Sequence, residues 1–97
     1  MTKEELKEVT KNAVLNIAVM ILQDGADNPM DLVENYVEQM MGDLRGINKR
    51  NLKLFILMQS MRLADNKEFK ARVKVKREEF VDTESGEIVS ITTTTIV

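Results

Sequence analysis

The sequence predicts an α+β fold in which a three-helix N-terminal part packs on a C-terminal antiparallel β-hairpin. Apolar residues recur at helical spacing through the first two thirds of the 97 residues, and the period then changes to two. Residues 54–58 are five consecutive apolar residues. Such a run covers every side of a helix, which must then be wrapped on several sides. We therefore expect one domain over 1–97 with the third helix at its centre.

Helices are predicted at about 3–24, 29–44 and 49–65. Thr2 and Glu5 form a capping box at the start of the first, and Gly25 suits a left-handed end to it. The second begins at Pro29, a favoured first helical residue. The third follows an asparagine cap at Asn48 or Asn51.

Strands are predicted at about 69–81 and 87–97. Between Phe69 and Lys76, apolar residues alternate with lysine and arginine, which predicts a strand with one apolar and one basic face. Residues 82–87 read as a hairpin loop with Gly86 in the left-handed position. If Thr83 faces Glu87, then Val73 faces Val97, Val75 faces Thr95 and Val81 faces Val89. We expect these odd-numbered positions to face inward and cover the third helix.

The composition excludes several kinds of chemistry. Apolar residues make up 43% and charged residues 31% of a chain that has no cysteine and no histidine. Disulfides, thiolate metal sites and a histidine base are therefore absent. We expect no enzymatic activity, no metal, no cofactor and no small-molecule substrate. The absence of cysteine favours a cytoplasmic protein. The nearly apolar run at 13–22 is too short to span a bilayer, so we expect no membrane segment.

Charge is segregated along the chain. Residues 1–44 carry a net charge of −6, residues 45–77 of +9 and residues 78–97 of −5. The basic segment is a candidate surface for nucleic acid or another anion. Its candidate contacts are Arg45, Lys49, Arg50, Lys53, Lys70, Arg72, Lys74 and Lys76.

The order of three helices and a hairpin is similar to the layout of winged-helix DNA-binding domains. That resemblance implies base contacts from the start of the third helix. The hairpin loop at 82–87 is acidic, however, and the middle of the third helix is too apolar to lie in a groove of DNA. The alternative to a nucleic-acid surface is a solvated strand face whose lysines discourage edge pairing.

Two of the predicted helices contain more apolar residues than a domain of this size can readily bury. Residues 13–22 and 54–58 are both apolar around most of a helix, and a domain of this size encloses one such helix more readily than two. We therefore predict an oligomer or partner interface on the first helix. Its candidate residues are Val14, Leu15, Ala18, Val19 and Leu22.

These patterns favour a small, non-catalytic interaction protein, expected to be a homo-oligomer, that binds or sequesters a macromolecular partner as an accessory or inhibitory factor. The expected partners are a second copy and another protein. The alternative is a nucleic-acid-binding protein of winged-helix-like layout, which salt-dependent retention on DNA would distinguish. A third interpretation, an acidic surface on the second helix that mimics a partner, ranks last.

Overall fold

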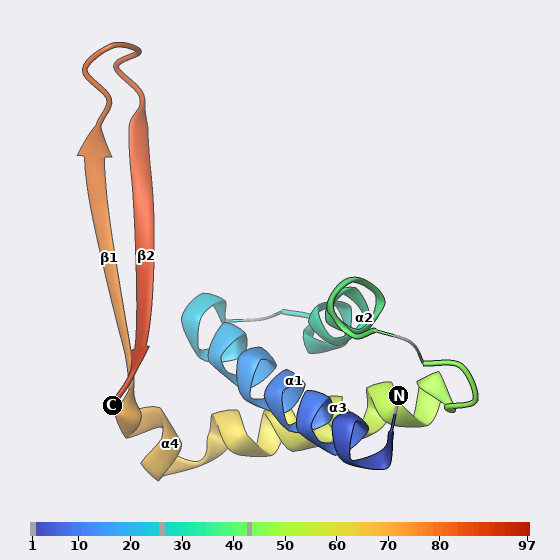
Figure 1. The fold of residues 1–97 in the computed structure, drawn as a ribbon. Coiled ribbons are helices and arrows are strands. Elements are labelled where there is room, and N and C mark those ends of the chain that lie inside the picture. The colour runs from blue at the N-terminus through green and yellow to red at the C-terminus, as the bar shows by residue number, and fades with distance from the viewer. Residues whose placement is uncertain (1, 26, 43) are drawn as a thin grey trace.

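The chain forms an L, with a helical body as one arm and a projecting β-hairpin as the other (Figure 1). The structure is a computed structural model that describes residues 2–25, 27–42 and 44–97. Its elements are α1 (Lys3–Asp24), α2 (Pro29–Met40), α3 (Lys49–Asp65), α4 (Lys67–Arg72), β1 (Val73–Val81) and β2 (Ile88–Ile96). The α+β class with a C-terminal antiparallel hairpin is confirmed.

Side-chain and backbone caps set the helix ends. The Thr2 hydroxyl accepts a hydrogen bond from the Glu5 amide at 3.1 Å. The amide of Gly25, with φ of 63°, donates to the Ile21 carbonyl at 2.9 Å and ends α1. The Asn48 side chain accepts from the Asn51 amide at 3.1 Å and starts α3. Each cap satisfies a backbone group that the helix itself leaves without a partner.

The core lies where α3 meets α1 and α2. Ile17 of α1, Val33 and Val37 of α2 and Ile56 of α3 are fully buried in one cluster. A second cluster joins α1 and α3 to α4 through Ala18, Ala64 and Phe69, and Val73 at the base of the hairpin packs against it. Helix α3 is therefore central, as predicted, and the helices pack on the base of the hairpin.

Two polar contacts tie α2 to its neighbours. The Asn16 side chain on α1 donates to the Tyr36 hydroxyl at 3.0 Å. The Lys53 ammonium on α3 donates to the Glu38 carboxylate at 2.9 Å. This hydrogen bond, together with the positive charges of Lys53 and Lys49, lowers the pKa of Glu38 below its ordinary value.

Two predicted element boundaries were wrong. Helix α2 ends at Met40 and not at residue 44, because the backbone of Met41 is extended. Residues 69–72 are helical and not strand: Asn66 caps the short helix α4 by accepting from the Phe69 amide at 3.0 Å. Phe69 is thereby buried in the second cluster.

The predicted register was wrong by one residue. Asp82 and Glu87 close the loop, with the Asp82 amide donating to the Glu87 carbonyl at 2.8 Å, so four residues lie between them and not three. Val73 therefore faces Ile96, Val75 faces Thr94 and Val81 faces Ile88. The predicted left-handed Gly86 is present, with φ of 74°.

The odd-numbered face of β1 does not cover α3 as expected. Beyond Val73 the hairpin points away from the helical body (Figure 1), and Val75 and Val81 are exposed. Only the base of the hairpin contributes to the core. The rest of this arm lacks the packing that usually supports a two-stranded hairpin, which is only marginally stable in water when isolated.

Candidate protein interface

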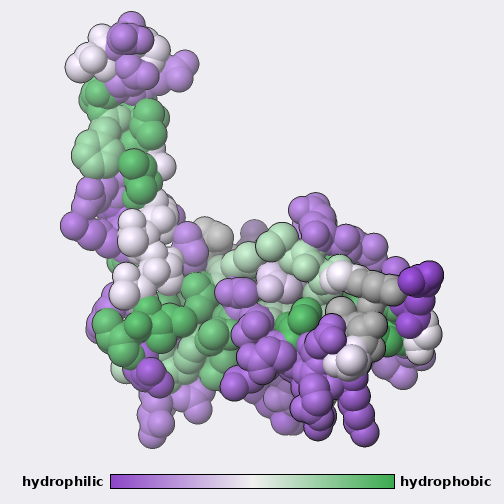
Figure 2. Space-filling model, viewed as in Figure 1, coloured by the Kyte–Doolittle hydropathy of each residue, from purple (hydrophilic) through white to green (hydrophobic). Residues whose placement is uncertain are grey.

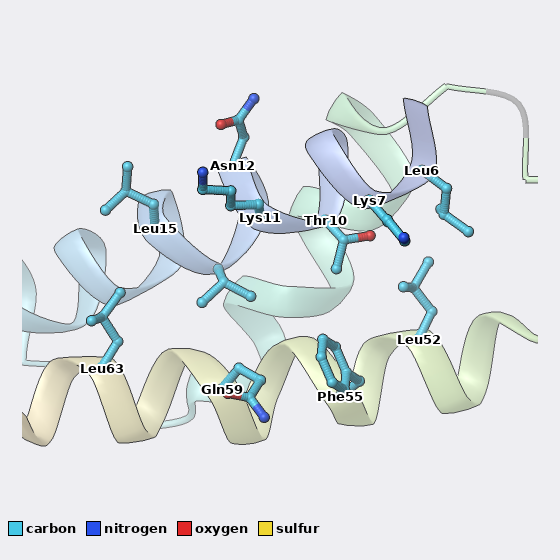
Figure 3. Close-up of a pocket in the computed structure, with 11 residues that line it drawn as sticks. Leu6, Lys7, Thr10, Lys11, Asn12, Leu15, Leu52, Phe55, Gln59 and Leu63 are labelled. Atoms are coloured by element: carbon cyan, nitrogen blue, oxygen red, sulfur yellow. The ribbon is translucent and has the colours of Figure 1, made fainter. Parts of the chain in front are cut away.

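An apolar groove runs between α1 and α3 (Figure 3). It encloses about 600 Å³ and lies against Leu6, Val14 and Leu15 of α1 and Leu52, Phe55 and Leu63 of α3 among other residues. Figure 3 shows Leu52 and Phe55 directed from α3 toward α1. Lys7, Lys11 and Gln59 supply polar groups at this groove. It resembles a site for apolar side chains more than a site for a charged ligand.

A stripe of exposed apolar residues lies beside this groove on α3. Leu54, Phe55, Met58 and Met61 are 47–49% exposed. Leu54, Met58 and Met61 follow spacings of four and three, which align them on one side of the helix. Phe55 belongs to both the stripe and the groove, so the two form one continuous surface. We call the stripe and the groove together the α3 face.

The hairpin carries a second exposed apolar surface in its distal half. Phe80, Val89 and Ile91 share one face of the hairpin, and Val81 and Ile88 share the other. All five are exposed. Figure 2 shows this apolar region directly below the polar tip. Exposed contiguous apolar surface of this kind marks protein interaction sites.

The area left in contact with solvent is large for a chain of this mass. The structure exposes 7156 Å², whereas a compact monomer of 11.1 kDa exposes about 5,650 Å². The excess is about 1,500 Å². The radius of gyration is 16.1 Å, against about 12.5 Å for a compact chain of this length. The hairpin that projects from the helical body lengthens the molecule (Figure 1), and large apolar side chains of α3 and the hairpin are exposed.

The predicted interface residues on α1 are mostly enclosed within the protomer. Ala18 is fully buried, and Val19 and Leu22 pack beside it against α3 and α4. Val14 lines the groove and packs on the core, and Leu15, 37% exposed, is the one among these five that the structure leaves open. Ala18 of α1 and Ala64 of α3 are buried in the second cluster, and Ser60, one turn before Ala64, is also buried. The sequence pattern did not reveal that these small residues belong to the contact between α1 and α3.

More apolar surface is exposed on α3 than at the predicted interface residues of α1, although the sequence had predicted that α3 is wrapped on several sides. The sequence did contain a signal that one side of α3 is exposed. Asn51 and Asp65 stand at the two ends of the Leu54, Met58 and Met61 row at the same spacing, and polar ends are typical of a stripe that reaches solvent.

The predicted basic residues do not form one patch. Arg45, Lys49 and Arg50 lie before or within the first turn of α3, whereas Lys70, Arg72, Lys74 and Lys76 follow its other end. A helix of 17 residues separates them by about 25 Å. Only Lys74 and Lys76 lie on the strand face where four residues had been expected.

Several of these cations also have partners within the chain. Lys53 binds Glu38, Lys70 lies 3.6 Å from Asp65, and Lys76 pairs with Glu78. The Arg72 side chain donates to the Val97 carbonyl at 2.6 Å. Nucleic-acid binding remains a prediction, but these pairs leave less positive charge for a phosphate backbone than the sequence suggested.

The hairpin tip is acidic and structurally constrained. It carries Asp82, Glu84 and Glu87 without a basic residue. The Asp82 carboxylate accepts from the Glu84 amide at 2.8 Å. Backbone amides of Glu84 and Ser85 lower the pKa of Asp82. Asp82 therefore stays ionised to a lower pH than an unperturbed aspartate.

Two further observations limit the chemistry of the described residues. No cluster of three or more acidic side chains within them is arranged to hold a metal ion. None of the helices in this part of the chain has the length and apolarity needed to cross a membrane.

Comparison with protein-family models, with curated proteins and with solved structures gives no match for this chain. Its function must therefore be inferred from the surfaces described above.

Proposed function

We propose that this protein is a non-catalytic interaction protein that binds other polypeptide chains, itself included, and acts by covering or sequestering a macromolecular partner. The observation that carries the proposal is the excess of about 1,500 Å² of exposed surface. Large apolar side chains on the α3 face and the distal hairpin are among the exposed residues.

The size of this excess suits self-association. If two protomers covered it mutually, the interface would bury about 3,000 Å² in total, within the range of obligate homodimers. Methionine is well suited to such a surface, because its flexible thioether adapts to irregular contacts. Met58 and Met61 both belong to the α3 stripe.

The experiment is a single substitution on the α3 stripe, Met58→Glu, compared with the matched control Gln39→Glu. Both positions are exposed and helical, but Gln39 lies on α2 outside the α3 face. Light scattering or sedimentation velocity over a range of concentrations would measure the mass. We expect oligomers for the wild type and Gln39→Glu, and a shift to the 11.1 kDa monomer for Met58→Glu.

A wild type that stays monomeric throughout the micromolar range would refute self-association. A target protein that binds the wild type and Gln39→Glu but not Met58→Glu would then identify the α3 face as the surface for a different partner. Equal masses for Met58→Glu and the wild-type oligomer would remove the α3 face from the interface.

A further inference from the structure

We infer that two copies of this chain form a twofold dimer by exchanging arms, with the hairpin of each protomer lying along α3 of the other. The inference rests on the proposed function in one respect, namely that the protein self-associates. It names the occupant of the α3 face and the orientation of that occupant.

The shape of the protomer permits this exchange. The hairpin rises from the C-terminal end of α3, so that α3 and the hairpin are the two arms of the L (Figure 1). The nine-residue strands extend about 30 Å, and the 17-residue α3 extends about 25 Å. A twofold axis along the bisector of an L exchanges its two arms. Arms of similar length then overlap along their whole extent, and the dimer closes with one isologous interface.

The order of chemical groups along the hairpin matches the order along α3. One face of the hairpin carries Lys74, Lys76 and Glu78 in its basal half, Phe80 with Val89 and Ile91 farther out, and the acidic tip beyond them. Lys76 and Glu78 pair with each other. The exposed side of α3, taken from its C-terminal end, carries Asp65, then Met61, Met58 and Leu54, and then Arg50.

Arg50 extends the stripe because it precedes Leu54 by four residues, one helical turn. When a partner hairpin lies with its tip at the start of α3, acidic groups meet Arg50. Apolar side chains then meet apolar side chains. The basal lysines contribute less, because Lys76 already pairs with Glu78 and Asp65 lies 3.6 Å from Lys70. The reverse orientation would place the acidic tip beside Asp65 and away from Arg50, which is unfavourable.

The exchange also explains two local features. Glu38 already lies beside Lys53 and close to Lys49, but Arg50 is a further cation at the positive end of the α3 dipole, which is unfavourable. Acids in the tip of the partner hairpin supply an anion for Arg50. The distal hairpin, marginal as an isolated element, gains a helix surface against its apolar face.

The first test is a charge-reversal cycle on the full-length chain with Arg50→Glu, Glu84→Lys and the double variant. Both residues are exposed, so we expect all variants to fold, which far-UV circular dichroism would verify. Each single reversal places like charges at two symmetric contacts, and we expect the dissociation constant of the dimer to rise about tenfold. The double variant restores opposite charges, and its dissociation constant should return to near the wild-type value. The differences should shrink in about 0.5 M salt, because exposed pairs are screened.

The second test uses the absence of native cysteine. One preparation carries Arg50→Cys, and another of different mass carries Glu84→Cys. After subunit exchange, a short bis-maleimide reagent should join the two preparations to each other. The matched control replaces Arg50→Cys by Glu34→Cys, an exposed position on α2, and should give little heterodimer.

The outcomes distinguish this inference from the proposed function. A dimer with no preference for the Arg50–Glu84 cross-link, or single reversals that the double variant does not rescue, would overturn arm exchange but leave self-association standing. A Thr93→Cys variant treated with the same reagent tests whether two copies pair through their β2 edges. If it forms cross-linked homodimers in preference to the Arg50–Glu84 cross-link, arm exchange is overturned. A monomeric wild type would overturn both.

Discussion

Replacing Ile56 by alanine tests the assignment of opposite sides of α3 to core and interface. Ile56 is fully buried between α3 and the other two helices, in the cluster that contains Ile17 and Val33. Met58, two residues along the same helix, is 48% exposed. Ile56→Ala and Met58→Ala therefore remove similar amounts of apolar side chain, the first from a buried site and the second from an exposed one.

The expected loss at Ile56 follows from its burial. Ile56→Ala removes three buried carbon atoms, each contributing about 0.8 kcal/mol, or about 2.4 kcal/mol before any cavity is counted. The residual cavity in a close-packed core raises this to about 3–4 kcal/mol. Met58→Ala removes a side chain that is already half in water, and alanine is the better helix former, so we expect about 1 kcal/mol or less in the monomer.

Urea denaturation followed by far-UV circular dichroism would measure both losses, since the chain has no tryptophan for fluorescence. The protein should be dilute enough to be monomeric, because association stabilises the folded state by mass action. With a slope near 1.5 kcal/mol per molar urea, Ile56→Ala should lower the midpoint by about 2 M. Equal shifts for the two variants, or a larger shift for Met58→Ala, would show that the sides of α3 are assigned wrongly.

Two further predictions concern Glu38 and Gly86. Because the folded-state pKa of Glu38 lies below its ordinary value of 4.5, its contribution to stability is present above pH 4.5 and lost as the pH falls through the lower folded-state value. The unfolding free energy of the wild type should therefore exceed that of Glu38→Gln at pH 7 and approach it near pH 3. Glu34→Gln is the exposed control, and a pH-independent difference would contradict the assigned cause. Gly86→Ala forces a side chain into φ of 74° with nothing within 4 Å of the new methyl group, so backbone strain alone should cost about 1–2 kcal/mol. Hydrogen exchange should accelerate at the amides of β1 and β2 but not in α1, and uniform acceleration would show that the hairpin and helices unfold together.

The starts of α1, α2 and α3 were the most predictable part of the fold, because helix starts are encoded locally. Thr2 and Asn48 cap α1 and α3 through contacts three residues away. Helix α4 was missed because alternation from Phe69 to Lys76 is typical of a strand. The capping residue Asn66, followed by six helix-compatible residues, was the local signal for a helix.

The register could not be fixed from sequence because two loop lengths satisfy the same residues. Gly86 adopts the left-handed conformation in both. Three residues between the closing pair give the predicted register, and four give the observed one, which Asp82 and Glu87 close through their backbone. Apolar residues occupy both faces of the distal hairpin, so burial does not penalise the shift as it would in a one-sided sheet.

The location of the exposed apolar surface was unpredictable for a related reason. Periodicity shows that a side chain needs apolar cover, but not whether the cover comes from the same chain. The apolar run of α1 and that of α3 looked equivalent in the sequence. Ala18 and Ala64 are buried in one cluster where α1 packs on α3, and Leu54 and Met58 lie on the exposed side of α3.

A hairpin folded back over α3 and a hairpin lying on α3 of a second copy satisfy the same apolar pattern. In this protein Val97 and Arg72 close the hairpin at its base through paired backbone and side-chain hydrogen bonds. These bonds fix the arm where it leaves α4, and α4 directs it away from its own α3 (Figure 1). The element that sequence reasoning missed, α4, is therefore what leaves the α3 face uncovered within the protomer and available to a second copy.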